Sequence, residues 1–546
     1  MTIHFPLPST SIDHPPAFVS VLSCQDWLAG VPLANSAAAQ VMLLKQINAL
    51  NAYTLTATDR LAMLETLRPT VSDVQDEMAK KFACKPLPLT PPEQAALDGT
   101  IALWHAVLNG YLRLINCAES EPSLTEERAR IIQRALAVCC DWQLDLCRGA
   151  LLPGSDYWSV LHKILAIGEK MAVLSLSVDD GPRHGSTLTS PLAAYGEAVM
   201  LFTANAFELL PRQLNWVARW SKRWGVKLAL LQSAPTTVGN RALPIFVDLA
   251  SDRPPCYFPK EAQEGRWLET TALRKSLKTR LALLEKGEQP SRLNMGEDCT
   301  QPAAGQLLLR AYQRWCKGGS PRKQERKSTT GTCEFIVSLN AAHYYLSGRQ
   351  VFQPPMLDDQ ALRRDREALA TFGEARRKNS DFSEQQGFDI ESWSLTADWQ
   401  LLDQSTSGLR LARPLKEGLR VGVGQLVAVK LAGSSQFVLG TVRWALQTLP
   451  TDGPAMLSTG IELYPGIAQP IAVRGGDPGT REAFRQGLRL PSVAALSVPE
   501  TLIVPYGTYR VGRPIEILAQ GQTEKIKLAH VLDRTQEFER CTFTAI

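Results

Sequence analysis

The amino-acid sequence predicts an α+β multidomain fold: an all-α helical N-terminal region, then an antiparallel β-barrel and additional C-terminal β structure. Apolar residues recur at steps of three and four over roughly the first 300 residues, and they alternate in short runs beyond Gly331. A chain of 546 residues that is 45% hydrophobic can also fill several cores. We expect a tail at 1–34, a helical domain at 35–300, a barrel at 301–475 and a β extension at 476–546.

The helical pattern is clearest in two consecutive stretches. The first stretch has an apolar face that consists of Leu61, Leu64, Leu67, Val71, Val74, Met78 and Phe82. Pro69 lies within it and is expected to kink or break the helix. The second stretch starts at Thr90, Pro91 and Glu93, which form a capping box with proline in the first turn. Several such helices joined by short turns predict a bundle or an irregular α-solenoid. Three tryptophans at helical spacing are expected to pack in its core, namely Trp216, Trp220 and Trp224.

Short alternating segments predict the β structure. The barrel strands are expected at Cys333–Leu339, Trp399–Asp403, Leu426–Leu431, Phe437–Trp444 and Ser458–Leu463. The C-terminal strands are expected at Thr501–Val504, Pro514–Leu518 and Ile526–Val531. A charged segment at about 354–391 interrupts the barrel pattern, and we expect it to form a solvated helix plus a mobile linker.

The charge balance does not favour a non-specific coat of nucleic acid or membrane. Lys and Arg number 59 against 54 Asp and Glu, so any anionic partner must be bound locally. The N-terminus lacks the basic and apolar parts of a signal peptide, and no stretch approaches the ~18–20 apolar residues of a membrane span. The 11 cysteines are scattered without a C-x-x-C pair, and the histidines show no metal-ligand spacing. We therefore expect a cytoplasmic protein with no metal site.

One short motif is chemically informative. Asp403, Ser405 and Gly408 lie where one expected strand ends and the next begins. A carboxylate and a hydroxyl can point into the same turn there, while a glycine lets a ligand approach the backbone. The alternative is an Asx-type β-turn with no ligand.

These residues resemble the PilZ family of bacterial receptors for the second messenger cyclic di-GMP. That family has an R-x-x-x-R element entering its barrel and a D/N-x-S-x-x-G element on the barrel, and Asp403, Ser405 and Gly408 match the second element. The R-x-x-x-R spacing occurs several times in the chain, including Arg310/Arg314 on a helical pattern. Arg322 and Arg326 fit best because they lie in a polar stretch just before the first expected barrel strand. Two later segments, Gly440–Trp444 and Gly460–Leu463, are also similar to strands of that barrel.

The resemblance implies a ligand-binding site for cyclic di-GMP formed by Arg322, Arg326, Asp403, Ser405 and Gly408. Arginine forks suit phosphate and the O6 and N7 acceptors of guanine, whereas Asp403 and Ser405 would bond the guanine edge. The secondary candidates are Lys323, Arg410 and Arg443. The two elements normally lie closer together than they do here, so the charged segment must loop out between the first two strands for the arginines to reach the site.

The sequence thus predicts a cytosolic cyclic di-GMP receptor that changes its domain arrangement and regulates an unidentified protein partner through the helical region. No nucleophile elbow, Walker loop or dinucleotide-binding glycine loop is present, so we expect no catalysis and no cofactor. The alternative is a helical protein-interaction scaffold with a PilZ-like barrel that no longer binds nucleotide. A less favoured alternative is a single-stranded nucleic-acid binder.

Overall fold

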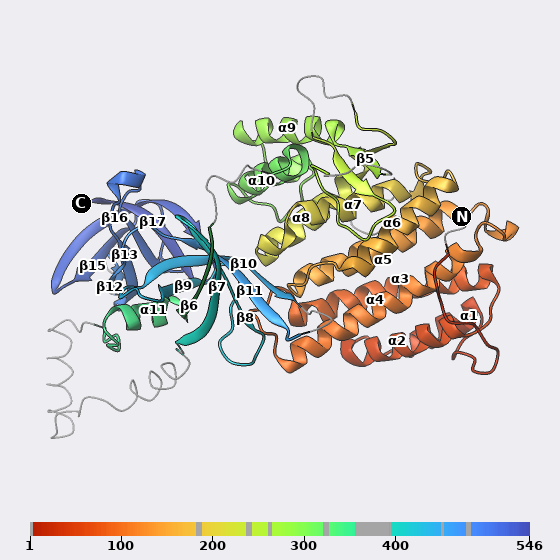
Figure 1. The fold of residues 1–546 in the computed structure, drawn as a ribbon, viewed down its shortest axis with the longest axis horizontal. Helices are drawn as coiled ribbons and strands as arrows, with labels where there is room; N and C mark the ends of the chain where they lie inside the picture. The colour runs from red at the N-terminus through yellow and green to blue at the C-terminus, as the bar shows by residue number, and fades with distance from the viewer. Residues whose placement is uncertain are drawn as a thin grey trace. The chain divides into compact units, whose positions relative to one another are not determined.

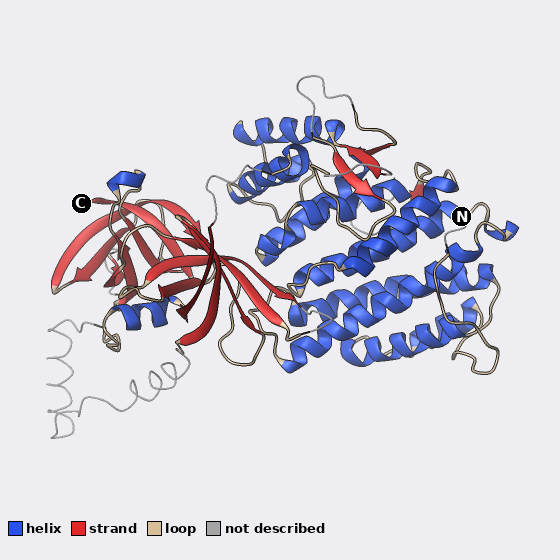
Figure 2. Cartoon of the chain, in the orientation of Figure 1, coloured by secondary structure: helices blue, strands red, loops and turns tan. Residues whose placement is uncertain are grey.

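The computed structural model describes residues 4–181, 188–235, 243–259, 265–319, 327–354, 393, 395–448, 453–476 and 482–546. The chain divides into two compact units. Unit 1 comprises Met1–Lys85 and Leu89–Arg322, and unit 2 comprises Pro86–Pro88 and Lys323–Ile546. Unit 1 is mostly helical and unit 2 is mostly strand (Figure 2). The expected α+β multidomain fold is therefore confirmed.

Unit 1 is built from helices that follow one another in the chain (Figure 1). Their bounds are α1 Val21–Ala29, α2 Ser36–Ala52, α3 Ala57–Phe82, α4 Pro91–Cys117, α5 Arg128–Arg148, α6 Ser155–Lys170, α7 Pro191–Thr203, α8 Pro211–Trp224, α9 Thr271–Glu285 and α10 Ala303–Lys317. Short strands add two small antiparallel sheets: β1 Val178–Asp179 with β2 Leu188–Thr189, and β3 Ala229–Leu231, β4 Ile245–Asp248 and β5 Gly265–Glu269 in the order β3-β5-β4.

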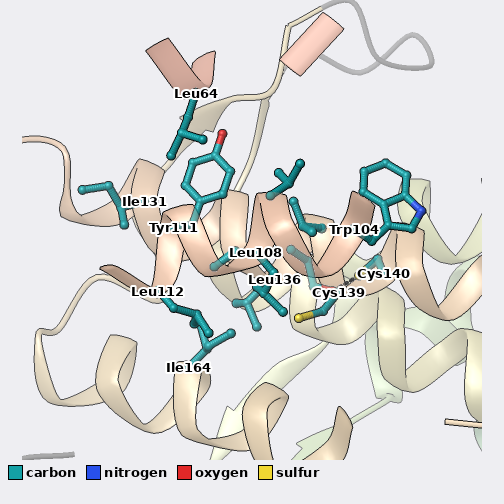
Figure 3. Packing of buried hydrophobic residues seen from close by; sticks show 14 of the residues in the cluster. Leu64, Trp104, Leu108, Tyr111, Leu112, Ile131, Leu136, Cys139, Cys140 and Ile164 are labelled. Carbon is teal, nitrogen blue, oxygen red and sulfur yellow. Dashed lines mark hydrogen bonds between the residues drawn. The ribbon is translucent and has the colours of Figure 1, made fainter. Parts of the chain in front are cut away.

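The predicted apolar face and capping box both form, whereas the helix is not divided at Pro69. Every residue of the apolar face predicted around Pro69 is buried on α3, and the helix continues through the proline. The capping box of α4 is formed, with the Thr90 N–H donating to the Glu93 carboxylate at 2.8 Å. Figure 3 shows how α4 then packs on α5, with Trp104 and Tyr111 among the buried side chains.

The three spaced tryptophans belong to a second core of unit 1. Trp216, Trp220 and Trp224 on α8 are each at most 1% exposed and pack with residues of α9 and α10. The Trp220 indole N–H donates to the Met295 carbonyl at 2.8 Å. Their expected role in core packing is confirmed.

Unit 2 contains two closed antiparallel barrels. The first is formed by β6 Lys327–Val337, β7 Thr396–Ser405, β8 Gly408–Pro414, β9 Leu426–Leu431, β10 Val438–Thr448 and β11 Met456–Leu463. The second is formed by β12 Gln469–Gly475, β13 Arg485–Leu490, β14 Thr501–Pro505, β15 Pro514–Ala519, β16 Gln522–Arg534 and β17 Phe538–Ala545. The expected boundary at 475 falls at the end of β12, a strand of the second barrel.

The two barrels share one strand order. Reading around each barrel, the first strand is followed by the second, third, sixth, fifth and fourth, and the fourth closes on the first. The C-terminal β structure that the sequence predicted is thus a complete barrel with the topology of the first. The charged insertion lies outside the described residues apart from Pro354.

A shared core joins the two barrels. The helix α11 Leu339–Leu346 follows β6, and its Leu339, Ala341 and Ala342 are buried together with side chains from both barrels. The Glu537 carboxylate, just before β17, accepts the backbone N–H groups of Leu339 and Leu426. These two groups begin α11 and β9, so one side chain of the C-terminal barrel holds two elements of the first barrel region.

Unit 2 also includes the short segment Pro86–Pro88. Leu87 and Val421 exchange backbone hydrogen bonds of 2.8 and 2.7 Å, and Leu87 is 1% exposed. The Arg420 guanidinium donates two hydrogen bonds to the Pro86 carbonyl, at 2.7 and 3.0 Å. The connection between β8 and β9 therefore carries an added β-bridge.

Candidate functional site

The predicted motif occupies the tight turn between β7 and β8. Ser405 and Gly408 are directly paired, with only Thr406 and Ser407 between them. The Ser405 hydroxyl donates to the Gly408 carbonyl at 3.4 Å. A Cβ on Gly408 would lie 2.8 Å from the Ile461 carbonyl oxygen, so the glycine allows the close approach of β11. This role in strand packing is separate from the backbone access for a ligand that we predicted.

Asp403 lies beside Arg410 on neighbouring strands. The two residues are antiparallel partners, and the Asp403 carboxylate lies 3.9 Å from an Arg410 guanidinium nitrogen. The Asp403 side chain is 17% exposed and that of Arg410 is 46% exposed. This separation is within ion-pair range but exceeds that of a hydrogen bond. The secondary candidate Arg410 thus shares a face with Asp403.

The start of β6 lies on the other side of β7. Lys327 pairs with Gln404, and Ser328 pairs with Asp403. The predicted Arg322, Lys323 and Arg326 lie outside the described residues. Arg326 directly precedes Lys327 in the sequence. The pairing of β6 with β7 thereby brings the chain that follows the arginine element to the motif, despite the charged insertion between the two strands.

Trp444 is a residue of this face that the motif search missed. Gly460 on β11 is the partner of both Arg410 on β8 and Trp444 on β10. A Cβ on Gly460 would lie only 2.0 Å from the indole nitrogen of Trp444, so the indole covers the glycine. The signal was present in the sequence, because an aromatic residue and a glycine on two adjacent expected strands can form such a cross-strand pair.

These residues form one row across four neighbouring strands. Asp403, Arg410, Gly460 and Trp444 follow one another on β7, β8, β11 and β10. With strands about 4.8 Å apart, such a row presents a carboxylate, a guanidinium and an indole within one small area. This set can hydrogen-bond a planar edge, pair with an anion and stack on a ring.

The remaining candidate, Arg443, is engaged by two carboxylates. It forms ion pairs with Glu462 of β11 and with Asp533 of β16, the latter at 3.3 Å. Partial desolvation would lower the pKa of Arg443, whose side chain is still 46% exposed, but Glu462 and Asp533 hold that pKa above its ordinary value. Arg443 therefore connects the first barrel to the C-terminal barrel.

Comparison with known protein families gives three matches in chain order. Residues 22–235 match the N-terminal domain of the cyclic-di-GMP receptor FimW, residues 245–398 match its middle PilZ domain, and residues 471–546 match its C-terminal β-barrel domain. The chain belongs to the PilZ-domain family of cyclic di-GMP receptors. The match to the middle PilZ domain ends at residue 398, so the turn from Asp403 to Gly408 lies beyond it.

A full-length relative supports this PilZ-family membership. The cyclic-di-GMP receptor FimW of Pseudomonas aeruginosa is 23% identical, in an alignment that covers 93% of this chain and 87% of the relative. No solved structure matches the chain significantly. The second barrel, which the sequence indicated only as extra β structure, is thus a domain that has its own family match.

The helical unit of this PilZ-family chain carries a cleft of about 700 Å³ between α3, α5, α7 and α8. Among the described residues that line it, six are carboxylates and four are cations. At its floor Asp145, 2% exposed, accepts hydrogen bonds from Trp104 and Arg148, each at 2.8 Å. Burial raises the pKa of Asp145, and the neighbouring Arg148 opposes that shift.

Two searches of the described part of the chain gave negative results. No helix there is long and apolar enough to cross a membrane. No group of three or more His, Cys, Asp or Glu side chains there could hold a metal ion. The cysteines are all free in the structure.

Proposed function

We propose that this protein is a cyclic di-GMP receptor that binds the messenger on the barrel face formed by β6, β7, β8, β11 and β10. The observation that carries the proposal is the register of β6 and β7, which places Lys327 opposite Gln404 and Ser328 opposite Asp403. Arg322, Lys323 and Arg326 directly precede this point in the chain. Both halves of the recognition motif can therefore act on one ligand.

Each chemical group of the ligand has a counterpart in this site. The messenger carries two phosphates and two guanines; Arg322 and Arg326 would meet a phosphate or the O6 and N7 edge of guanine. Asp403 and Ser405 would bond the donors of a guanine edge, and Gly408 would hold the turn in register with β11. Trp444 adds a stacking surface, since base–aromatic stacking contributes about 1–3 kcal/mol per base. Lys323, Lys327 and Arg410 raise the local positive potential.

Ligand binding would shift the domain arrangement because the messenger has a higher affinity for one arrangement than for another. A messenger that binds both Asp403 and the arginine element draws residues 322–326 onto the barrel face. Those residues connect α10 of unit 1 to β6 of unit 2. A ligand that favours one arrangement of this connection shifts the population of domain arrangements toward it. We propose that this shift, without catalysis or a cofactor, is the output of the receptor in the cytoplasm.

The unidentified protein partner would bind through the helical unit. The cleft between α3, α5, α7 and α8 has an excess of carboxylates, which suits a segment rich in lysine or arginine. The same cleft favours the second candidate function, a helical scaffold whose barrel no longer binds nucleotide. The scaffold predicts partner capture that is unaffected by cyclic di-GMP, whereas the receptor predicts capture that changes when the messenger is added.

Calorimetry on the purified full-length protein tests the proposal. We expect heat of binding with cyclic di-GMP at tens of micromolar protein, and none with GMP or with a short single-stranded DNA. Absence of heat with cyclic di-GMP would remove the receptor function. Binding to DNA that weakens steeply with salt would instead support the nucleic-acid alternative.

A further inference from the structure

A β-bulge places Arg443 and Trp444 on the same face of the first barrel. The register between β10 and β11 shifts between Val442 and Trp444, which leaves Arg443 as the extra residue. A bulge of this kind turns two successive side chains toward one side of the sheet. The exposure agrees, because Arg443 is exposed and Trp444 half-buried, whereas Val442 and Ala445 are buried.

A chain of ion pairs fixes this bulge from the second barrel. Asp533 on β16 contacts Arg443 at 3.3 Å and Arg540 on β17 at 2.8 Å. The Arg540 guanidinium lies 4.4 Å from the centre of the Tyr464 ring. Asp533 and Arg540 are only 14% and 16% exposed, so solvent screens their pairing less than it screens an exposed pair.

The same bulge borders the proposed ligand site. Glu462, the other partner of Arg443, lies directly opposite Gly408 of the motif. Trp444, the next residue along the chain, covers Gly460 beside Arg410. A shift of Arg443 is therefore expected to displace both its ion-pair partner Glu462, opposite Gly408, and the adjacent Trp444.

We propose that Asp533 of the C-terminal barrel is a positioning residue for the messenger site, because it holds Arg443 and thereby sets the position of the Trp444 indole. This inference rests on the proposed function. It assigns the second barrel a role in ligand affinity although none of the motif residues belongs to it.

The chain offers a closely matched control. Glu516 on β15 is a carboxylate with 16% exposure that also pairs with two basic residues, Arg474 and Lys525, within the second barrel. Asp533→Ala and Glu516→Ala thus remove the same kind of group from the same barrel. Asp533→Asn serves as a second, isosteric variant if the alanine variant does not fold, and Asp533→Glu tests rescue by a conservative change.

Two measurements test the inference in the full-length protein. The first is ¹⁹F NMR of protein labelled with fluorotryptophan, in which the Trp444 resonance is assigned by its loss in Trp444→Leu. Asp533→Ala should shift this resonance, Asp533→Glu should restore it and Glu516→Ala should leave it in place. A Trp444 resonance that Asp533→Ala does not move would overturn the inference.

The second measurement is calorimetry with cyclic di-GMP. Asp533→Ala should weaken binding about fivefold, in the usual range for residues coupled through one ion-pair network, and Glu516→Ala should not. In a Trp444→Leu background Asp533→Ala should cause no further loss, because it acts through that indole. Wild-type affinity in Asp533→Ala, or the same loss in both backgrounds, would overturn the inference. If the wild type binds no cyclic di-GMP but the NMR result holds, the proposed function fails and the positioning of Trp444 by Asp533 stands.

Discussion

Ser328 lies directly opposite Asp403 in the antiparallel pair of β6 and β7. β6 begins one residue earlier, at Lys327, and the arginine element Arg322–Arg326 precedes it in the chain. Ser328 and Asp403, far apart in sequence, are thus neighbours because β6 pairs with β7. Their separation in the sequence does not predict this proximity.

Replacement of Asp403 should weaken the messenger site without unfolding the barrel. Asp403→Asn removes the charge but keeps the size, and we expect about a tenfold loss of affinity for cyclic di-GMP, since a hydrogen bond to a charged group contributes ~1.5–3 kcal/mol. The control is Asp398→Asn on the same strand, whose carboxylate pairs with Lys416 at 2.6 Å. Calorimetry that shows equal losses in both variants would contradict a specific role for Asp403.

A side chain at Gly408 should destabilise the first barrel. The Cβ of Gly408→Ala would meet the Ile461 carbonyl at 2.8 Å, and backbone atoms in a paired strand cannot easily move away. We expect a loss of about 1–3 kcal/mol in the free energy of unfolding, the usual cost of overpacking. Gly331→Ala on β6 is the control, because a Cβ there meets no atom within 4 Å. Equal thermal midpoints for the two variants would refute the packing role.

A side chain at Gly460 should displace the Trp444 indole instead. The Cβ of Gly460→Ala would lie 2.0 Å from an atom at the edge of that ring, which can move by changing rotamer. We therefore expect weaker binding of cyclic di-GMP with little change in the thermal midpoint. Comparison of the calorimetric affinity with the melting curve separates the two effects, and unchanged affinity would argue against stacking on Trp444.

Buried His162 should make the helical unit less stable in mild acid. Its ring accepts a hydrogen bond from the Tyr195 hydroxyl and donates one to the Arg253 carbonyl, both at 2.9 Å. Burial lowers the pKa of His162 below its ordinary 6.5, although the Arg253 carbonyl and Asp248 oppose this shift. The unfolded chain then binds the proton more readily, so the contribution of His162 is complete above about pH 6.5 and falls as the pH drops toward the lower folded pKa.

The measurement for His162 is urea unfolding of the full-length protein between pH 5 and pH 8, followed by the signal of the helical unit. His162→Phe should show a smaller decline in stability below pH 6.5 than the wild type, even if it is less stable overall. Identical slopes in the two proteins would contradict the assignment.

Loss of Glu537 should loosen the junction of the two barrels. Its carboxylate accepts the Leu339 and Leu426 N–H groups, so Glu537→Ala leaves two backbone donors without this acceptor. We expect a loss of about 1–3 kcal/mol in the stability of unit 2, with Glu537→Gln less affected because it keeps one acceptor oxygen. The exposed Glu417→Ala is the control, and equal unfolding midpoints in all three variants would exclude the role of Glu537.

The sequence predicted those parts of the fold that depend on residues close together in the chain. The α3 face and the Thr90–Glu93 box depend on residues within one or two turns, and both form as expected. A strand was expected to begin at the motif, but the bounds of β8 were not predicted because it alternates poorly, with Leu411, Ala412 and Arg413 all buried. Several C-terminal strands were missed as well, including β12, β13 and β17. Closure of the second barrel was not predictable either, because it depends on the pairing of β12 with β15, which are far apart in the chain.

The site was predictable only where its residues are adjacent in sequence. Asp403, Ser405 and Gly408 were found because a turn brings them together within six positions. The register of Arg410 with Gly460 and Trp444, and the ion pair of Arg443 with Asp533, arise from pairing and packing between distant segments. Such relationships depend on the closed barrels, which the sequence pattern does not specify.

The central claim is that the arginine element before β6 and the motif on β7 bind one messenger together, and calorimetry of paired arginine variants tests it most directly. The chain provides the control, because Arg310 and Arg314 have the same R-x-x-x-R spacing but lie on α10 and pair with Glu208. We predict that Arg322→Ala/Arg326→Ala abolishes the heat of cyclic di-GMP binding and that Arg310→Ala/Arg314→Ala retains wild-type affinity. Wild-type binding by the Arg322/Arg326 variant would contradict the account.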